Sequence, residues 1–187
     1  MTVSSAGGRP GRLDPVRATL SACCALVLGI GLGRFAYTPL IPALIGAQWF
    51  GPGDAALLGA ANLAGYLGGA LAGRPLAARW RAAPMLRLMM LLAALSFFAC
   101  SARFSFAWFW VWRLASGFSG GVLMVLAAPT ALPGVPPSRR GLAGGPIFTG
   151  VGLGIVFSAT LVPALMRWGL PQTWRGLGLL GLALTAL

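Results

Sequence analysis

The chain has 187 residues, of which 58% are hydrophobic and only 9% are charged, and its mean hydropathy is +0.84. This composition excludes an ordinary soluble domain and indicates a membrane protein. The net charge of +12 comes from fourteen arginines, most of which lie in short breaks between apolar runs, so nucleic acid is not an expected partner.

Few side chains in the sequence can do chemistry. The chain has no His and only two acidic residues, Asp14 and Asp54. General acids, general bases and hard-metal ligands are therefore scarce. We expect no enzymatic activity, no cofactor and no metal site.

Residues 1–17 are polar and rich in Gly and Pro, and we predict that they form a flexible cytoplasmic tail. Crossing about 30 Å of hydrocarbon takes roughly 20 helical residues. Five apolar runs meet this length, at 18–45, 55–73, 84–101, 107–132 and 142–166. A sixth run, 174–187, is too short to cross at about 1.5 Å per residue, so the chain looks truncated. The predicted fold is an all-α membrane bundle of six helices, the sixth of them truncated.

The first run contains a permanent charge, Arg34. Helix rise places it about 24 Å from the inner end of the run, in the outer half of the membrane. Residues 31–36 also fit the dinucleotide-binding pattern G-x-G-x-x-A. That pattern needs a preceding strand and a soluble βαβ unit, and the sequence predicts neither.

Glycines recur at every fourth position in several runs. The second run has Gly65, Gly69 and Gly73, and the same spacing relates Gly29 to Gly33, Gly117 to Gly121 and Gly150 to Gly154. Such stripes let helix backbones approach closely where lipid supplies no hydrophobic drive. Glycine is common in this chain, with 28 residues, but three in register on one helix favour packing over coincidence. We therefore predict a tightly packed bundle.

Arg113 is the second intramembrane charge and lies about 9 Å from the outer end of the fourth run, so it can share the depth of Arg34. An intramembrane charge is a functional site by default, although both side chains can also snorkel to the outer headgroups. The runs contain no carboxylate, so a buried arginine needs carbonyls, Asn62, Tyr37, another part of the protein or a substrate. A guanidinium suits carboxylate and phosphate groups. Our hypothesis is that Arg34 and Arg113 bind a small organic anion in a cavity that Tyr37 and Asn62 help to line.

Asn62 and Thr149 have interpretations other than ligand binding, and Pro146 is a candidate for a helix bend. Asn62 either lines the cavity or cross-links helices. The hydroxyl of Thr149 is expected to bond to its own helix. Pro146, next to Gly144 and Gly145, is the best candidate for a kink that serves gating.

The distribution of arginine predicts the orientation. The tail, the 74–87 region and the 133–141 loop hold nine arginines, whereas the opposite side holds Arg103, Arg167 and Arg175. The positive-inside rule then puts the N-terminus in the cytoplasm. Aromatic residues are predicted at the membrane interfaces, with Trp80 at the inner side and, at the outer side, Trp49, Phe50, Phe104, Trp108, Trp110, Trp168 and Trp174.

Three segments resemble motifs of the major facilitator superfamily. "GALAGRPLAARWR" is similar to the loop motif G-x-L-a-D-r-x-G-r-r, with Gly73 where Asp is usual and Leu76 where Gly is usual; "RLASGFSGG" is similar to R-x-x-x-G-x-x-x; and "GLAGGPIFTG" is similar to the antiporter-type G-x-x-x-G-P-x-x-G-G. The segments "GLGRFAYTPLIP" and "FTGVGLGIVFSATLVP" resemble the YbfB/YjiJ-type branch of that superfamily. The matched positions, for which the resemblance implies conformational or gating roles, are Gly69, Arg74, Gly117, Gly141, Gly145, Pro146 and Gly150.

The resemblance implies a twelve-helix secondary active transporter of two six-helix halves, with residues from about 18 onward equivalent to its N-terminal half. Its expected place is the bacterial inner membrane, and its expected partners are a small solute, the lipid bilayer, and a C-terminal six-helix half or a second copy of the chain. The alternative is a non-transporting membrane scaffold or a decayed half-transporter. The DNA beyond codon 187 discriminates between the two: a second six-helix block there favours transport, whereas a stop codon with a folded six-helix product favours the alternative or a homodimer.

Overall fold

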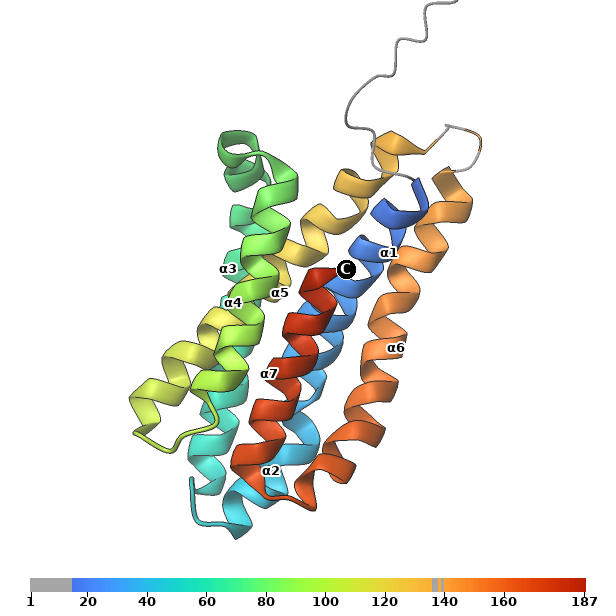
Figure 1. The fold of residues 1–187 in the computed structure, drawn as a ribbon. Helices are drawn as coiled ribbons and strands as arrows, with labels where there is room; N and C mark the ends of the chain where they lie inside the picture. Colours follow the sequence, from blue (N-terminus) through green and yellow to red (C-terminus); the bar gives the residue numbers. More distant parts are fainter. Residues whose placement is uncertain (1–14, 136–137, 139) are drawn as a thin grey trace, which may run out of the picture.

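The computed structural model describes residues 15–135, 138 and 140–187, and in these residues all regular structure is helical (Figure 1). The elements in chain order are α1 (Pro15–Leu26), η1 (Val27–Phe35), α2 (Tyr37–Gly46), α3 (Pro52–Trp80), α4 (Ala82–Ala99), α5 (Phe106–Ala131), η2 (Leu132–Gly134), α6 (Arg140–Met166) and α7 (Leu170–Ala186). Five helical stretches of the described chain are long and apolar enough to cross a membrane: Val16–Gly46, Pro52–Trp80, Ala82–Ala99, Phe106–Ala131 and Arg140–Met166. The predicted all-α membrane bundle is therefore confirmed.

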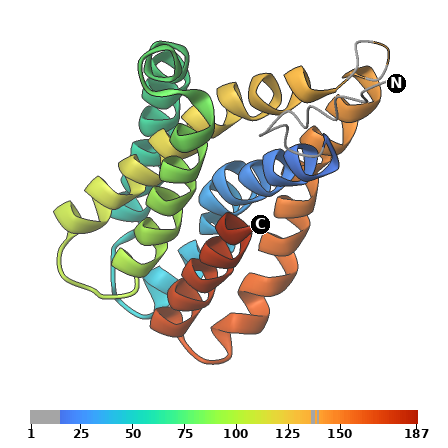
Figure 2. The same cartoon turned by 45° about the horizontal axis from the view of Figure 1, so that its top comes forward.

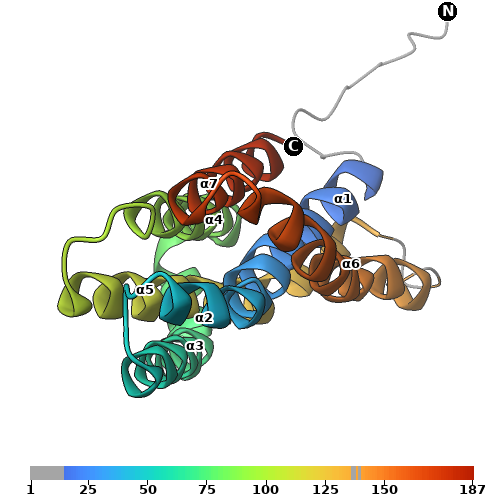
Figure 3. The same ribbon diagram turned by 90° about the horizontal axis from the view of Figure 1, so that it is seen from below.

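The spanning elements run up and down, so their connections gather at two ends (Figure 1). We call α1, η1 and α2 together the first spanning element, because they form one continuous stretch. Seen along the bundle, α4 and α7 lie side by side on one edge and α3 lies on the opposite edge, with α5 and α2 between them (Figure 3). Helix α6 lies beside α1 and η1 (Figure 2). The first spanning element is thus surrounded by α3, α5 and α6, and residues on it can meet all three.

Glycines form the contact between α3 and α5, as the stripes predicted. A Cβ atom on Gly65 or Gly69 would collide with the α5 backbone at Leu114 and Phe118. From the other side, a Cβ on Gly117 would collide with the backbone of Asn62. Because no larger side chain fits at these three positions, the two backbones pack in direct contact, which compensates for the missing hydrophobic drive in lipid.

A second glycine contact joins the first spanning element to its neighbours. Gly31 on η1 packs directly against Gly154 on α6, and Gly150, one turn earlier on α6, packs against the Cys23 backbone of α1. Gly29 faces α5, where an added Cβ would come within 2.6 Å of the Leu123 side chain. These contacts hold η1 close to both α5 and α6.

Two aromatic residues that we predicted at the outer membrane interface lie inside the bundle instead. Trp174 is 1% exposed and Phe50 is 8% exposed. Phe109 lies between them, with ring centroids 4.8 Å from Phe50 and 6.2 Å from Trp174 in edge-to-face geometry. The correction has a physical reason: burial of these large rings and their edge-to-face contacts with Phe109 stabilise them inside the bundle. Phe104 and Trp168, by contrast, are 73% and 69% exposed.

Candidate functional site

The first spanning element contains an irregular segment at its centre. The nine residues of η1 form a π-helix, in which backbone bonds reach back five residues, between two ordinary α-helices. Glycine is a poor α-helix former, and η1 has Gly29, Gly31 and Gly33, so its sequence has little preference for the α form. π-helical turns are rare and frequently mark functional sites. Arg34 is the last but one residue of this segment.

Arg113 extends from α5 toward this segment and is 2% exposed. Its Nη1 donates a hydrogen bond to the Gly33 carbonyl oxygen at 3.2 Å, and its Cζ lies 4.2 Å from the centroid of the Tyr37 ring. Its Nε has no hydrogen-bond partner within the described part of the chain. The buried cation is therefore held by a carbonyl and an aromatic face, two of the partners that the sequence suggested.

Tyr37 and Asn62 connect the surrounding helices. The Tyr37 hydroxyl donates to the Ala55 carbonyl of α3 at 2.9 Å. The Asn62 Nδ2 donates to the backbone carbonyl of Arg113 at 3.1 Å, which links α3 to α5. Of the two roles considered for Asn62, the structure shows the cross-link, and Asn62 also borders the pocket described below.

Arg34 has a different environment from Arg113. Its side chain is exposed, and its Cζ lies 5.6 Å from the Tyr66 ring centroid and 5.8 Å from that of Phe35. Among the residues that the structure describes, no hydrogen bond or ion pair to this guanidinium is found. Its donors are available to a ligand.

A pocket of about 390 Å³ lies between the first spanning element and α3, and it brings together all four residues that the sequence singled out for a cavity. Polar and charged side chains enter it from the first spanning element, α3 and α5, whereas its remaining wall is apolar and consists mostly of small residues. Asp54, next to the wall residue Ala55, is not among the lining residues. The pocket residues are Arg34, Tyr37, Thr38, Ile41, Ala55, Ala56, Gly59, Ala60, Asn62, Leu63 and Arg113.

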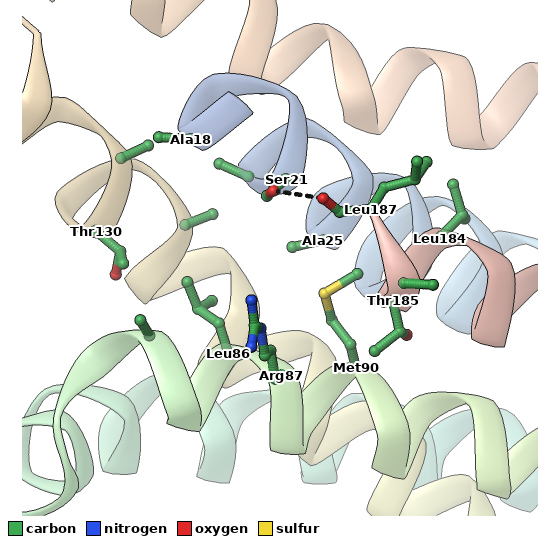
Figure 4. Close-up of a pocket in the computed structure, with 15 residues that line it drawn as sticks. Ala18, Ser21, Ala25, Leu86, Arg87, Met90, Thr130, Leu184, Thr185 and Leu187 are labelled. Atoms are coloured by element: carbon green, nitrogen blue, oxygen red, sulfur yellow. Dashed lines mark hydrogen bonds between the residues drawn. The ribbon is translucent and has the colours of Figure 1, made fainter. Parts of the chain in front are cut away.

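A second pocket, of about 340 Å³, lies near the start of α1 and the end of α7 (Figure 4). Arg87 reaches into it from α4, and across from it the Ser21 hydroxyl donates to the Leu187 carbonyl oxygen at 3.3 Å. None of the four predicted cavity residues lines this pocket. The candidate site is therefore the Arg34 pocket.

Sequence reasoning missed two buried hydroxyls beside the site. The Ser158 Oγ on α6 donates to the Gly31 carbonyl oxygen at 2.9 Å, and the Ser116 Oγ on α5 is buried with no partner in the described residues. Helical spacing contained a signal for both. Ser158 lies four residues after Gly154, which contacts Gly31, and Ser116 lies three residues after Arg113, so each shares a face with a residue already selected.

The residues matched to family motifs have mixed surroundings. Gly69 and Gly117 lie in the α3–α5 contact, and Gly150 lies against α1. Arg74 is exposed near the end of α3. Gly141, Gly145 and Pro146 are exposed on α6, and an added Cβ on either glycine would meet open space.

The Thr149 hydroxyl donates to the Pro146 carbonyl oxygen of its own helix at 2.7 Å. This confirms the expected bond of Thr149 within its helix.

Tyr37→Phe is expected to destabilise the bundle by about 1 kcal/mol, because the hydroxyl bond to Ala55 is lost while the ring stays over Arg113. Tyr37→Leu should cost more, because it also removes the cation–π contact. Thermal unfolding in lipid nanodiscs measures both variants. An equal loss of stability in Tyr37→Phe and Tyr37→Leu would show that the Tyr37 ring does not stabilise the buried guanidinium of Arg113.

The comparisons with known proteins agree with this architecture. The family model described as "Uncharacterised MFS-type transporter YbfB" matches residues 26–187, which is most of the chain and includes every residue of the Arg34 pocket. A search of curated proteins gives no match. The chain therefore belongs to the YbfB-type family of major facilitator superfamily transporters, and it is a multi-pass membrane protein.

Proposed function

We propose that the protein is a secondary active transporter that moves a small organic anion by alternating access and binds it in the Arg34 pocket. The observation that carries the proposal is the charge of this pocket: two guanidinium groups border it, and none of the described residues that line it has a carboxylate. Burying a cation in a membrane is costly, so a pair of arginines around one pocket indicates a negatively charged ligand. Membership of a transporter family supports the transport role.

The two arginines have unequal access to a ligand. Arg34 is exposed with free donors, so it is the group that we expect to contact a carboxylate or phosphate, in bidentate geometry. Arg113 lies behind the Tyr37 ring and adds positive potential in a region of low dielectric. The exposed hydroxyl of Thr38, one helical turn after Arg34, can donate to the same anion.

Alternating access requires a partner surface opposite the pocket. Helix α3 exposes Leu63, Leu67 and Leu71, and α6 exposes Phe148 and Leu153, so both helices present apolar side chains outward. Lipid can cover such a surface, but Arg34 and Thr38 lie between these two helices on the first spanning element. We propose that a C-terminal six-helix half, or a second copy of the chain, closes the pocket from this side.

The proposed setting is the bacterial inner membrane with the N-terminus in the cytoplasm. The start of α1, the α3–α4 connection and the start of α6 lie at one end of the bundle (Figure 1). In the described sequence, the arginines at or near these segments are Arg17, Arg74, Arg79, Arg81, Arg87 and Arg140, whereas those near the α4–α5 and α6–α7 connections are Arg103, Arg167 and Arg175. This asymmetry supports the orientation through the positive-inside rule. In this proposed orientation, the Arg34 pocket lies nearer the outer side of the membrane.

Uptake measurements test the proposal. Membrane vesicles from cells that express the complete gene are offered a panel of labelled carboxylates, phosphate esters, neutral sugars and amines. We expect transport of an anion, and we expect Arg34→Gln to raise its KM about tenfold or more, because a charge-assisted bond is worth about 1.5–3 kcal/mol. The KM of Arg34→Lys should lie between those of the wild type and Arg34→Gln, because lysine keeps the charge and loses the bidentate geometry.

The matched control is Arg175→Gln, which removes an exposed arginine from α7, outside the pocket. Its KM should equal that of the wild type. Transport of neutral solutes or amines alone, no transport of any solute in the panel, or an unchanged KM in Arg34→Gln would contradict the proposal.

A further inference from the structure

The π-helical segment η1 determines where Arg34 points. In an α-helix each residue turns the chain by about 100°, whereas a π-helical turn contains more residues per turn. Residues after η1 therefore face a direction different from the one they would face on an uninterrupted α-helix. In the observed form, Tyr37 and Leu40 are buried while Arg34 and Thr38 are exposed on the pocket side.

The carbonyl groups of η1 are held by side chains from two neighbouring helices. The Gly31 carbonyl accepts the Ser158 hydroxyl of α6, and the Gly33 carbonyl accepts Nη1 of Arg113 from α5. Immediately after the segment, the Ala36 N–H donates to the Leu32 carbonyl oxygen at 3.2 Å, four residues back, so α-helical bonding resumes there. A regular π-helix would pair Ala36 N–H with Gly31, the carbonyl that Ser158 satisfies.

We propose that Ser158 is a positioning residue: its hydroxyl satisfies the Gly31 carbonyl at the junction where π-helical bonding changes to α-helical bonding, fixes this junction, and thereby keeps Arg34 and Thr38 turned toward the pocket. Ser158 is 2% exposed and lies one turn from Gly154, whose direct contact with Gly31 brings the two backbones close enough for this bond. A buried carbonyl inside a membrane has no water to replace a lost donor. Removal of the hydroxyl therefore leaves the Gly31 carbonyl to pair with a backbone N–H of its own helix, which moves the junction and rotates the residues that follow.

The importance of this position for substrate binding rests on the proposed function, because it is Arg34 that we expect to contact the anion. The positioning itself does not depend on any substrate. It can be measured with a neutral thiol reagent, which does not respond to the charge of Arg34.

The experiment compares two cysteine reporters that line the same pocket, Thr38→Cys on the first spanning element and Ala60→Cys on α3. Each is placed in protein whose native cysteines, Cys23, Cys24 and Cys100, are changed to alanine. The protein is reconstituted in nanodiscs, and its labelling rate with methyl methanethiosulfonate is measured. Losing one hydrogen bond changes the equilibrium constant between the two forms about fivefold, so we expect Ser158→Ala to lower the Thr38→Cys rate relative to the Ala60→Cys rate by up to about fivefold.

Thr160→Ala is the matched control, because Thr160 lies two residues away on α6, is exposed, and donates its hydroxyl to the Val156 carbonyl of its own helix. Its rate ratio should equal that of the parent. Unchanged rates at both reporters in Ser158→Ala would overturn the proposal, because they would show no rotation. An equal change at both reporters, which also leaves the ratio unchanged, would overturn it too, because it would show general loosening.

A second readout keeps the two proposals separate. At Ala60→Cys, an anionic reagent is compared with a cationic one, and Ser158→Ala should shift their rate ratio toward the value that Arg34→Gln gives. If Arg34 confers no charge preference at all, the anion proposal fails while the neutral-reagent result still decides the role of Ser158.

Discussion

Gly69→Val is expected to prevent stable assembly of the bundle, whereas Gly68→Val, one residue away, is expected to leave it folded. A Cβ atom at Gly69 would lie 2.8 Å from the Phe118 carbonyl carbon and still closer to its oxygen, and backbone atoms cannot move aside as a flexible side chain can. At Gly68 the nearest atom to an added Cβ is on the Phe118 side chain, 3.9 Å away, which is ordinary contact. Overpacking of this kind costs about 3 kcal/mol, and here it also separates α3 from α5.

Thermal unfolding and size-exclusion chromatography in a mild detergent measure this difference. The pair is well matched, because both variants replace glycine by valine within the same helix, so the change in intrinsic helix propensity is the same. Equal stability of the two variants would show that the glycine contact does not hold the bundle together. Gly117→Val, on the opposite side of the same contact, should behave like Gly69→Val.

Arg113→Met is expected to reduce uptake about tenfold or more with little net change in thermal stability, because the desolvation energy saved offsets the lost bond to the Gly33 carbonyl. The guanidinium is fully buried with an unpaired Nε, and one carbonyl and one aromatic ring are its polar contacts among the described residues. Such a charge costs desolvation energy that a hydrophobic side chain of similar size does not. A residue that is costly to the fold is retained for function, here for the positive potential of the pocket and for the Gly33 contact.

The two halves of this prediction are measured separately, by uptake in vesicles and by unfolding of the purified protein. Arg87→Met serves as the control, because it removes an arginine that borders the other pocket. A large loss of stability in Arg113→Met would show that Arg113 is mainly a structural support. Normal uptake by Arg113→Met would show that Arg113 takes no part in transport.

The sequence was sufficient for the features that depend on composition and spacing. The membrane class follows from hydropathy, and close packing follows from the four-residue spacing of Gly65 and Gly69, although the spacing does not specify that α5 is the partner helix. Counting helix rise from the ends of two runs predicted that Arg34 and Arg113 can share one depth, and both border one pocket.

Other features depend on contacts between helices that one sequence does not specify. The π-helical form of η1 requires carbonyl partners from α5 and α6, and nothing within residues 27–35 indicates that Ser158 supplies one. The burial of Trp174 depends on its neighbour Phe109, about 65 residues earlier, rather than on its nearness to a helix end. In the same way, Arg34 and Arg113 have the same description in the sequence, an arginine within an apolar run. In the structure Arg34 is exposed and Arg113 is buried, because the two helix faces that contain them point in different directions.

The most direct test of the account is the charge preference of the Arg34 pocket, measured at Thr38→Cys in protein whose other cysteines are alanine. Labelling rates with an anionic and a cationic methanethiosulfonate are compared with and without Arg34→Gln. A unit charge about 6 Å away changes the energy by about 0.7 kcal/mol in water, and the two reagents differ by two charges, so the rate ratio should fall about tenfold when Arg34 is neutralised. Faster labelling by the anionic reagent, lost in Arg34→Gln, is the result that the account predicts; equal labelling by both reagents, or a ratio that Arg34→Gln leaves unchanged, would contradict it.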